Sequence, residues 1–229
     1  GAATGQPFAS GSAAAATTLM ALCSAGSHVV APQEVYGGTW SILTRQLARF
    51  GVQTDFVDMT DPEAVRAAIR PATAVVWGEV LANPSMTVTD LPAVAAVARE
   101  AGVPFVVDAT FASPVVCRPL EHGADLVMHS ATKYLGGHSD ATGGVVVGAP
   151  ELVARVRAVR LDLGGALAPD EAFLLLRGLQ TLPLRVARQC ATALEVATAL
   201  AAHPRVLRVD HPGLPSHRAH ARAQATLQG

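Results

Sequence analysis

The chain has 229 residues, 50% of them hydrophobic, and a formal net charge of −1. Its basic residues are spread along the sequence, which argues against nucleic-acid binding, and no apolar stretch approaches the roughly 20 residues of a membrane-spanning helix. The odd number of widely spaced cysteines (Cys23, Cys117 and Cys190) fits neither a disulfide framework nor a metal knuckle. We therefore expect a cytoplasmic protein, without a metal, whose partner is a small molecule.

Short β-branched runs alternate along the chain with longer stretches rich in Ala, Leu and Arg. This alternation is typical of βαβ units and predicts an α/β fold with a mostly parallel sheet flanked by helices. Each predicted strand is a nearly continuous apolar run, as in a sheet that is covered on both faces. The predicted strands are residues 28–31, 74–77, 105–107, 126–129 and 144–147.

Helix start and stop signals lie between these strands. The run Asp61-Pro62-Glu63 offers an N-cap, a proline at the first helical position and an acid in the first turn, so it predicts a helix over 61–70. Asp90 can cap a helix over 90–101, which Gly102 should end in a left-handed conformation. The remaining predicted helices are residues 150–160 and 169–202, the second of them interrupted at Pro183.

Polar residues follow several of the predicted strands. In open α/β sheets, ligands bind beyond the carboxyl ends of the strands, so these residues should converge on one site. They are Glu79 and Asn83 after one strand, Asp108 after a second, and Ser130, Thr132 and Lys133 after a third.

The residue types at this edge suit a particular kind of ligand. A buried carboxylate such as Asp108 is costly without a cation or a donor, and the protonated ring nitrogen of pyridoxal phosphate (PLP) is a partner that would make it useful. An aspartate that only caps the next turn is the alternative. Lys133 is expected in an apolar setting, where poor solvation favours the neutral amine that attacks an aldehyde.

Other residues suit the phosphate and the ring of the same ligand. The hydroxyls of Ser130 and Thr132 can donate to a phosphate, and the free N–H groups of a helix opening at Gly11-Ser12 can do the same, although an ordinary helix start is the alternative there. The ring of Tyr36 can stack on a flat cofactor and its hydroxyl can move protons, but chance placement is a fair rival.

Several segments together resemble a known family. Residues 125–140, DLVMHSATKYLGGHSD, are similar to the cofactor-lysine segment of the Cys/Met-metabolism PLP-dependent enzymes, which include cystathionine γ-synthase, cystathionine γ-lyase, methionine γ-lyase and O-acetylhomoserine sulfhydrylase. Four shorter segments also resemble parts of the family's site: Ser10-Gly11 its phosphate turn, Tyr36-Gly37-Gly38 its stacking tyrosine, Asn83-Pro84 its ring-hydroxyl contact and Val107-Asp108 its acid at the ring nitrogen.

This resemblance implies a fold, a site and a reaction. It implies a large PLP-binding domain over residues 1–178, of the type I PLP-dependent transferase kind, and the beginning of a small C-terminal domain over residues 179–229. Lys133 and Tyr36 would be catalytic in γ-replacement or γ-elimination on a homoserine ester, cystathionine or a methionine-type amino acid. The residues expected to bind the cofactor are Gly11, Ser12, Tyr36, Asn83, Asp108, Ser130, Thr132 and Lys133.

Other expectations concern what lies outside this sequence. Family members carry an N-terminal arm that reaches the neighbouring subunit and a C-terminal arginine that holds the substrate carboxylate, and neither is found between Gly1 and Gly229. We therefore expect a fragment of a longer gene product that is a homodimer or homotetramer. The alternative function is a non-catalytic PLP-fold remnant that acts only as a binding or interaction protein.

Overall fold

The sheet is the centre of the molecule, and the candidate site lies at the carboxyl ends of its inner strands. The computed structural model describes residues 2 and 4–228, so the outer limits of the two predicted domains, at Gly1 and Gly229, lie outside the described residues. Seven strands form one sheet in the order β1-β7-β6-β5-β4-β2-β3. They are β1 (Thr4–Phe8), β2 (His28–Pro32), β3 (Gln53–Val57), β4 (Thr73–Glu79), β5 (Phe105–Asp108), β6 (Leu126–Ser130) and β7 (Gly144–Gly148).

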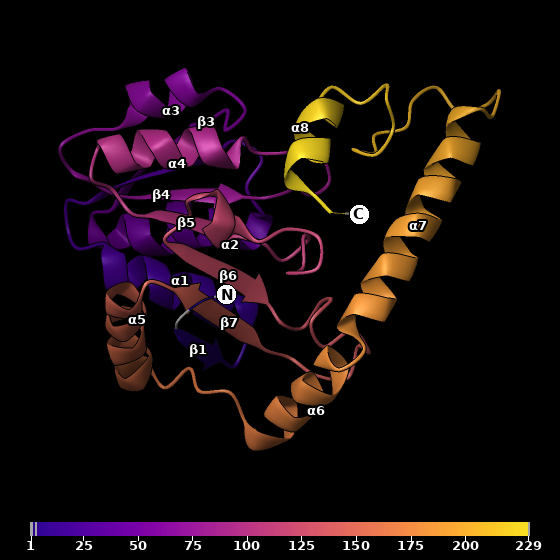
Figure 1. The fold of residues 1–229 in the computed structure, drawn as a ribbon. Helices are drawn as coiled ribbons and strands as arrows, with labels where there is room; N and C mark the ends of the chain where they lie inside the picture. The colour runs from indigo at the N-terminus through magenta and orange to yellow at the C-terminus, as the bar shows by residue number, and fades with distance from the viewer. Residues whose placement is uncertain (1, 3, 229) are drawn as a thin grey trace.

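Helices cover both faces of the sheet (Figure 1). The α-helices are α1 (Gly11–Leu22), α2 (Gly37–Ser41), α3 (Pro62–Ala68), α4 (Leu91–Glu100), α5 (Pro150–Leu163), α6 (Pro169–Leu179), α7 (Leu182–Ala201) and α8 (His220–Thr226). One apolar core joins α1 and α5 to one face through residues such as Leu19 and Val156, and another joins α3 and α4 to the opposite face through Val65 and Val94. The result is a three-layer α/β/α fold.

The prediction of a mostly parallel sheet is confirmed. All five predicted strands form, and β2 to β6 are parallel neighbours, but β7 runs antiparallel to both β6 and β1. The strands that the sequence did not indicate, β1 and β3, lie at the two edges. Because edge strands face solvent along one side, they tolerate the polar residues and the Pro7 that broke the expected apolar pattern.

The predicted helix boundaries are mostly confirmed. Asp61 and Asp90 cap α3 and α4 through their side chains, and Gly102 has the expected positive φ of 68°. The interruption expected at Pro183 occurs just before it: α6 ends at Leu179 and α7 begins at Leu182. Pro183 therefore lies in the first turn of α7, where its missing N–H needs no partner.

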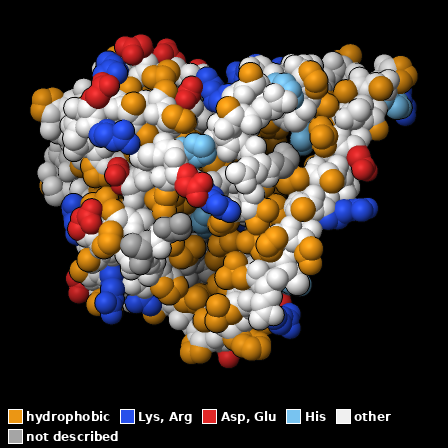
Figure 2. Space-filling view, viewed as in Figure 1, with side chains coloured by type: hydrophobic (Ala, Val, Ile, Leu, Met, Phe, Trp, Pro, Cys, Tyr) orange, Lys and Arg blue, Asp and Glu red, His pale blue; other side chains and the backbone are white. Residues whose placement is uncertain are grey.

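The last two long helices form a separate arm with exposed apolar side chains. Helix α7 extends away from the sheet layers, and Figure 2 shows hydrophobic side chains over α6 and α7 and in the hollow beside them. Phe173, Leu176 and Leu184 are 65%, 64% and 76% exposed. None of the described helices combines the length and apolar character needed to cross a membrane.

Candidate active site

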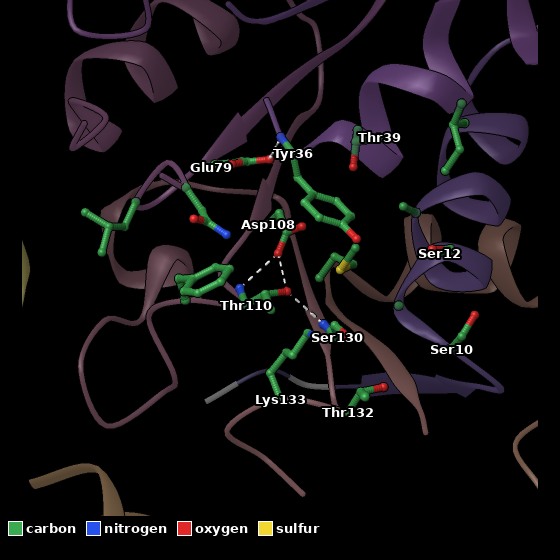
Figure 3. Close-up of a pocket in the computed structure, with 17 residues that line it drawn as sticks. Ser10, Ser12, Tyr36, Thr39, Glu79, Asp108, Thr110, Ser130, Thr132 and Lys133 are labelled. Carbon is green, nitrogen blue, oxygen red and sulfur yellow. Dashed lines mark hydrogen bonds between the residues drawn. The ribbon is translucent and has the colours of Figure 1, made fainter. Parts of the chain in front are cut away.

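All eight residues predicted to bind the cofactor line one pocket. The cavity has a volume of about 220 Å³ and lies beyond the carboxyl ends of β4, β5 and β6 (Figure 3). Its lining comprises Ser10, Gly11, Ser12, Ala15, Tyr36, Thr39, Ile42, Glu79, Leu81, Asn83, Asp108, Thr110, Phe111, Met128, Ser130, Thr132 and Lys133. Several segments between residues 10 and 133 therefore meet at the carboxyl ends of the strands, as expected for a parallel sheet.

Asp108 is the last residue of β5 and is only 8% exposed. One carboxylate oxygen, Oδ1, accepts hydrogen bonds from the N–H of Thr110 at 2.9 Å and from its hydroxyl at 2.5 Å. Among the described residues, Oδ2 has no hydrogen-bond donor. Burial raises the pKa of Asp108 above its usual range, although the Thr110 donors oppose this shift. Asp108 thus caps the following turn and still offers a second oxygen to a ligand.

Thr110 is a site residue that the sequence analysis missed. Its hydroxyl donates to Asp108 and accepts from the backbone N–H of Ser130 at 2.8 Å, so it joins the ends of β5 and β6. The spacing Asp108-Ala109-Thr110 fits an aspartate that accepts a hydrogen bond two residues ahead, which was the available signal.

The first turn of α1 brings backbone donors to the pocket. Ser10 caps the helix, because its hydroxyl accepts from the N–H of Ala13 at 3.0 Å. The N–H groups of Gly11 and Ser12 have no acceptor among the described residues. A Cβ at Gly11 would lie 2.6 Å from the Cβ and 2.9 Å from the Cα of Ser130, so only glycine lets the helix approach the end of β6 this closely. Free helix N–H groups at such a position favour an anion.

The two hydroxyls predicted to contact a phosphate differ in their surroundings. The Ser130 hydroxyl makes no hydrogen bond to the described residues and is free to donate. The Thr132 hydroxyl accepts from the N–H of Gly143 at 3.1 Å and lies 3.3 Å from the Gly143 carbonyl oxygen. Thr132 therefore also fixes the loop that leads into β7.

Lys133 lies at the mouth of the pocket and is the only lysine in the 229 residues. The expected apolar setting is wrong, because the side chain is exposed. The residue belongs to the turn after β6, and it lines a second cavity as well as the pocket, so solvent reaches it from the outer side. It nevertheless lines the same pocket as Asp108 and Thr110 (Figure 3).

Tyr36 precedes α2 and is 50% exposed. Its ring reaches into the pocket (Figure 3), and its backbone N–H donates to Oε1 of Glu79 at 2.7 Å. Asn83 also lines the pocket, from the exposed loop that follows β4. The structure therefore brings together the aromatic ring, the amide, the acid and the amine that the sequence singled out.

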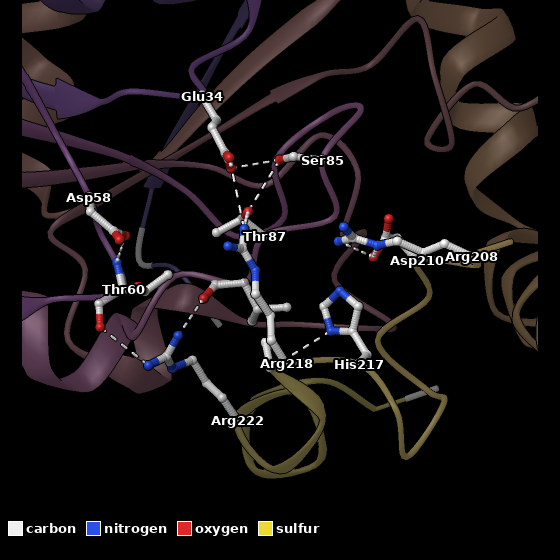
Figure 4. Close-up of polar contacts among 12 residues, drawn as sticks. Glu34, Asp58, Thr60, Ser85, Thr87, Arg208, Asp210, His217, Arg218 and Arg222 are labelled. Atoms are coloured by element: carbon white, nitrogen blue, oxygen red, sulfur yellow. Dashed lines mark hydrogen bonds and ion pairs between the residues drawn. The ribbon is translucent and has the colours of Figure 1, made fainter.

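The Asn83 loop is held by a distant part of the chain (Figure 4). Arg218 donates to the hydroxyl of Thr87 at 2.5 Å, and Arg222 of α8 donates to the carbonyl oxygen of Val88 at 3.0 Å. Val88 also packs against alanines of the α8 segment. The C-terminal residues thus brace this loop, although Arg222 and Val88 are 134 positions apart in the sequence.

Among the residues that the structure describes, no group of three or more His, Cys, Asp or Glu side chains is placed to hold a metal ion. His211, His217 and His220 each form a hydrogen bond within their own loop.

Glu79 is a buried acid to which the sequence analysis gave no role. It ends β4, pairs in register with Asp108, and is 6% exposed. Burial raises the pKa of Glu79 to about 8, the Tyr36 hydrogen bond opposes this, and the Asp108 charge adds to it. The folded chain therefore holds a proton on Glu79 that the unfolded chain releases near pH 4.5.

This raised pKa predicts a fall in stability with rising pH. Between pH 4.5 and about 8 the native state binds more protons at Glu79 than the unfolded state does, so the free energy of unfolding decreases as pH rises. Burial lowers the pKa of His129 from 6.5 to about 4, which has the opposite effect below pH 6.5. The decline should therefore be clearest from pH 6.5 to 8, with a slope of up to about 1.4 kcal/mol per pH unit.

Urea unfolding at a series of pH values measures this slope. Glu79→Gln should flatten it, whereas Glu151→Gln, the same change at an exposed side chain, is the matched control and should not. An unchanged slope in Glu79→Gln would assign the proton to another group.

The donor set of the pocket fits PLP. The unpartnered oxygen of the buried Asp108 suits a protonated ring nitrogen, and the N–H groups of Gly11 and Ser12 with the Ser130 hydroxyl suit a phosphate. The only lysine lies at the same pocket, where its amine can meet an aldehyde. Fold and pocket together define the class, a PLP-dependent α/β chain.

Comparison with known proteins gives the family. The family model described as "Cys/Met metabolism PLP-dependent enzyme" matches residues 1–229. The chain belongs to this family of PLP-dependent enzymes.

Named relatives support this assignment. The chain is 44% identical over 223 residues to a probable cystathionine gamma-synthase of Herpetosiphon aurantiacus, covering 97% of the chain and 70% of that protein. It is 44% identical over 226 residues to a cystathionine gamma-lyase of Bacillus subtilis, covering 98% of the chain and 59% of the relative. The crystal structure of metB from Corynebacterium glutamicum has a TM-score of 0.97 at 37% identity, covering 99% of this chain and 59% of that one. The chain thus spans about three fifths of the length of these last two proteins.

Proposed function

We propose that the protein containing this chain is a PLP-dependent enzyme that performs γ-replacement or γ-elimination on a sulfur amino acid or a homoserine ester. The observation that carries the proposal is the pocket, where a buried acid, the only lysine, a helix N-terminus and an aromatic ring line one cavity. The relatives' names, a synthase and a lyase, are consistent with either outcome. The comparisons give no support to the alternative of a non-catalytic remnant.

The chain's own residues have distinct proposed tasks. When bound, PLP supplies an aldehyde that captures the substrate amine and a ring that accepts electrons released at Cα. Asp108 would hold a proton on the ring nitrogen of PLP. Asn83 would orient the ring by contacting the hydroxyl group of the PLP ring. The Nζ of Lys133 removes the Cα proton, because a free amine at this position acts as a general base.

Departure of the γ-substituent requires that a second proton leave Cβ, whose electrons form the new Cβ–Cγ double bond, and that the leaving group take up a proton. The hydroxyl of Tyr36 makes no hydrogen bond to the described residues and its ring lies in the pocket, so Tyr36 is the proposed acid. Gly11, Ser12, Ser130 and Thr132 hold the phosphate, with Thr132 also bracing the loop before β7. These tasks remain predictions for each residue.

The partners follow from the same site. We propose a small amino acid as substrate, a cytoplasmic location and a homo-oligomer of two or four chains. The exposed apolar side chains of α6 and α7 support an oligomer, because surfaces of this kind are usually covered. Sedimentation of the chain with and without PLP measures its oligomeric state.

The function is tested by product analysis with the PLP-loaded chain. A homoserine ester with cysteine should yield cystathionine and the free carboxylic acid if replacement occurs. Cystathionine with water should yield cysteine, 2-oxobutanoate and ammonia if elimination occurs. Lys133→Ala is the control in each reaction, and product that is absent or independent of Lys133 would contradict the proposal.

A further inference from the structure

Two contacts bear on the position of Tyr36, one through its backbone and one through its ring. Its backbone N–H donates to Oε1 of Glu79 at 2.7 Å, and no other acceptor for it is found among the described residues. Its ring lies against Gly38, where a Cβ would come within 2.5 Å of Cε1 and 3.2 Å of Cδ1 of the ring. At Gly37, by contrast, an added Cβ would meet nothing within 4 Å. The ring therefore occupies space that only glycine leaves free.

Glu79 is a rigid anchor for this arrangement. Glu79 is the last residue of β4 and is 6% exposed. Its backbone carbonyl oxygen accepts a hydrogen bond from the Thr89 hydroxyl at 2.5 Å. The sheet and the Thr89 contact therefore hold its backbone, while its side chain spans to the loop that begins α2. Figure 3 shows the Glu79 carboxyl beside the Tyr36 backbone, at the edge from which the ring enters the pocket.

We propose that Glu79 is a positioning residue: its carboxyl, together with the space at Gly38, sets the place and plane in which the Tyr36 ring meets the cofactor. The inference rests on the proposed function, since it concerns how that ring stacks on PLP. It assigns a task to the one buried acid of the pocket that the proposed chemistry leaves unused.

The neighbouring acid explains how such an anchor can be buried. Glu79 and Asp108 end adjacent strands in register, and like charges at this spacing in a poorly solvated site are unfavourable. Burial raises the pKa of both groups, which keeps a proton on Glu79 while leaving Oε1 able to accept from Tyr36. A neutral glutamine should therefore replace Glu79, whereas alanine should not.

The test is a set of matched substitutions with the PLP dissociation constant as the readout, measured by absorbance titration. Glu79→Ala and Gly38→Ala should each weaken PLP binding by about tenfold, because a lost or displaced contact of this kind is worth about one factor of ten. Glu79→Gln and Gly37→Ala should stay within about twofold of the wild type. Thermal unfolding of each variant, read by circular dichroism, reports whether it folds.

A double-mutant cycle with Tyr36→Ala separates positioning from general damage. If Glu79 and Gly38 act through the ring, Glu79→Ala and Gly38→Ala should have almost no further effect in the Tyr36→Ala background. Effects that simply add would overturn the inference while leaving the cofactor site intact. A wild-type chain that does not bind PLP would overturn the proposed cofactor site and this inference with it.

Discussion

Replacing Lys133 with alanine is expected to abolish covalent attachment of PLP, from one cofactor per chain to none. Lys133 lines the pocket and is the only lysine of the chain, so no other side-chain amine can form the link. The measurement is borohydride reduction of the PLP-treated chain, followed by intact mass and peptide mapping. The wild type should carry the reduced cofactor on the peptide that contains Lys133.

Two controls make this result specific. The N-terminal amine is the other primary amine of the chain, and peptide mapping distinguishes the two. Lys133→Arg keeps the positive charge without a nucleophilic amine, so it should also carry no cofactor. Equal labelling of wild type and both variants would place the reactive amine elsewhere.

Replacing Asp108 with asparagine is expected to weaken PLP binding by about ten- to a hundredfold, because a hydrogen bond to a charged group is worth about 1.5–3 kcal/mol. The asparagine oxygen can still accept from Thr110, so the turn after β5 should persist. What is lost is the negative charge that the protonated ring nitrogen requires. The dissociation constant from an absorbance titration measures the effect.

Stability should change in a different direction from binding. Burial raises the pKa of Asp108, which means that its charged form costs free energy in the folded chain without a ligand. Asp108→Asn should therefore leave the free energy of unfolding unchanged or higher at pH 7 and above. Asp125→Asn, at the other end of the sheet, is the control and should not affect PLP binding. Loss of both binding and stability in Asp108→Asn would indicate a structural role instead.

Much of the fold could be predicted because its central strands are apolar on both faces. β4, β5 and β6 are buried almost throughout, and their runs stand out in the sequence. The edge strands could not be predicted, because solvent on one side allows Pro7 and Asp55 within them. The antiparallel direction of β7 was also not visible, since an apolar run carries no information on its partner.

The sequence predicted the residues of the candidate site better than the hydrogen bonds that join them. The carboxyl ends of neighbouring parallel strands lie on the same side of a sheet. Asp108 and Ser130, which end two such strands, could therefore be placed together from the sequence alone. The link from Thr110 to Ser130 and the link from Glu79 to Tyr36 join residues that are distant in the sequence, so no local pattern specifies them. The exposure of Lys133 depends on the cavities around its turn and was predicted incorrectly. The domain boundary near residue 178 stays a prediction.

The pairing of β1 with β7 has a consequence for how the chain folds. Thr4 lies opposite Gly148, and α1, which follows β1, packs on both β6 and β7. The edge of the sheet therefore closes over a loop of more than a hundred residues, a slow and entropically costly contact for any chain. The first residues of α1 follow β1 closely and lie against Ser130 at the end of β6. We therefore expect the pocket to be completed late in folding, after β7 has joined the sheet, and the gain of PLP affinity during refolding measures when this happens.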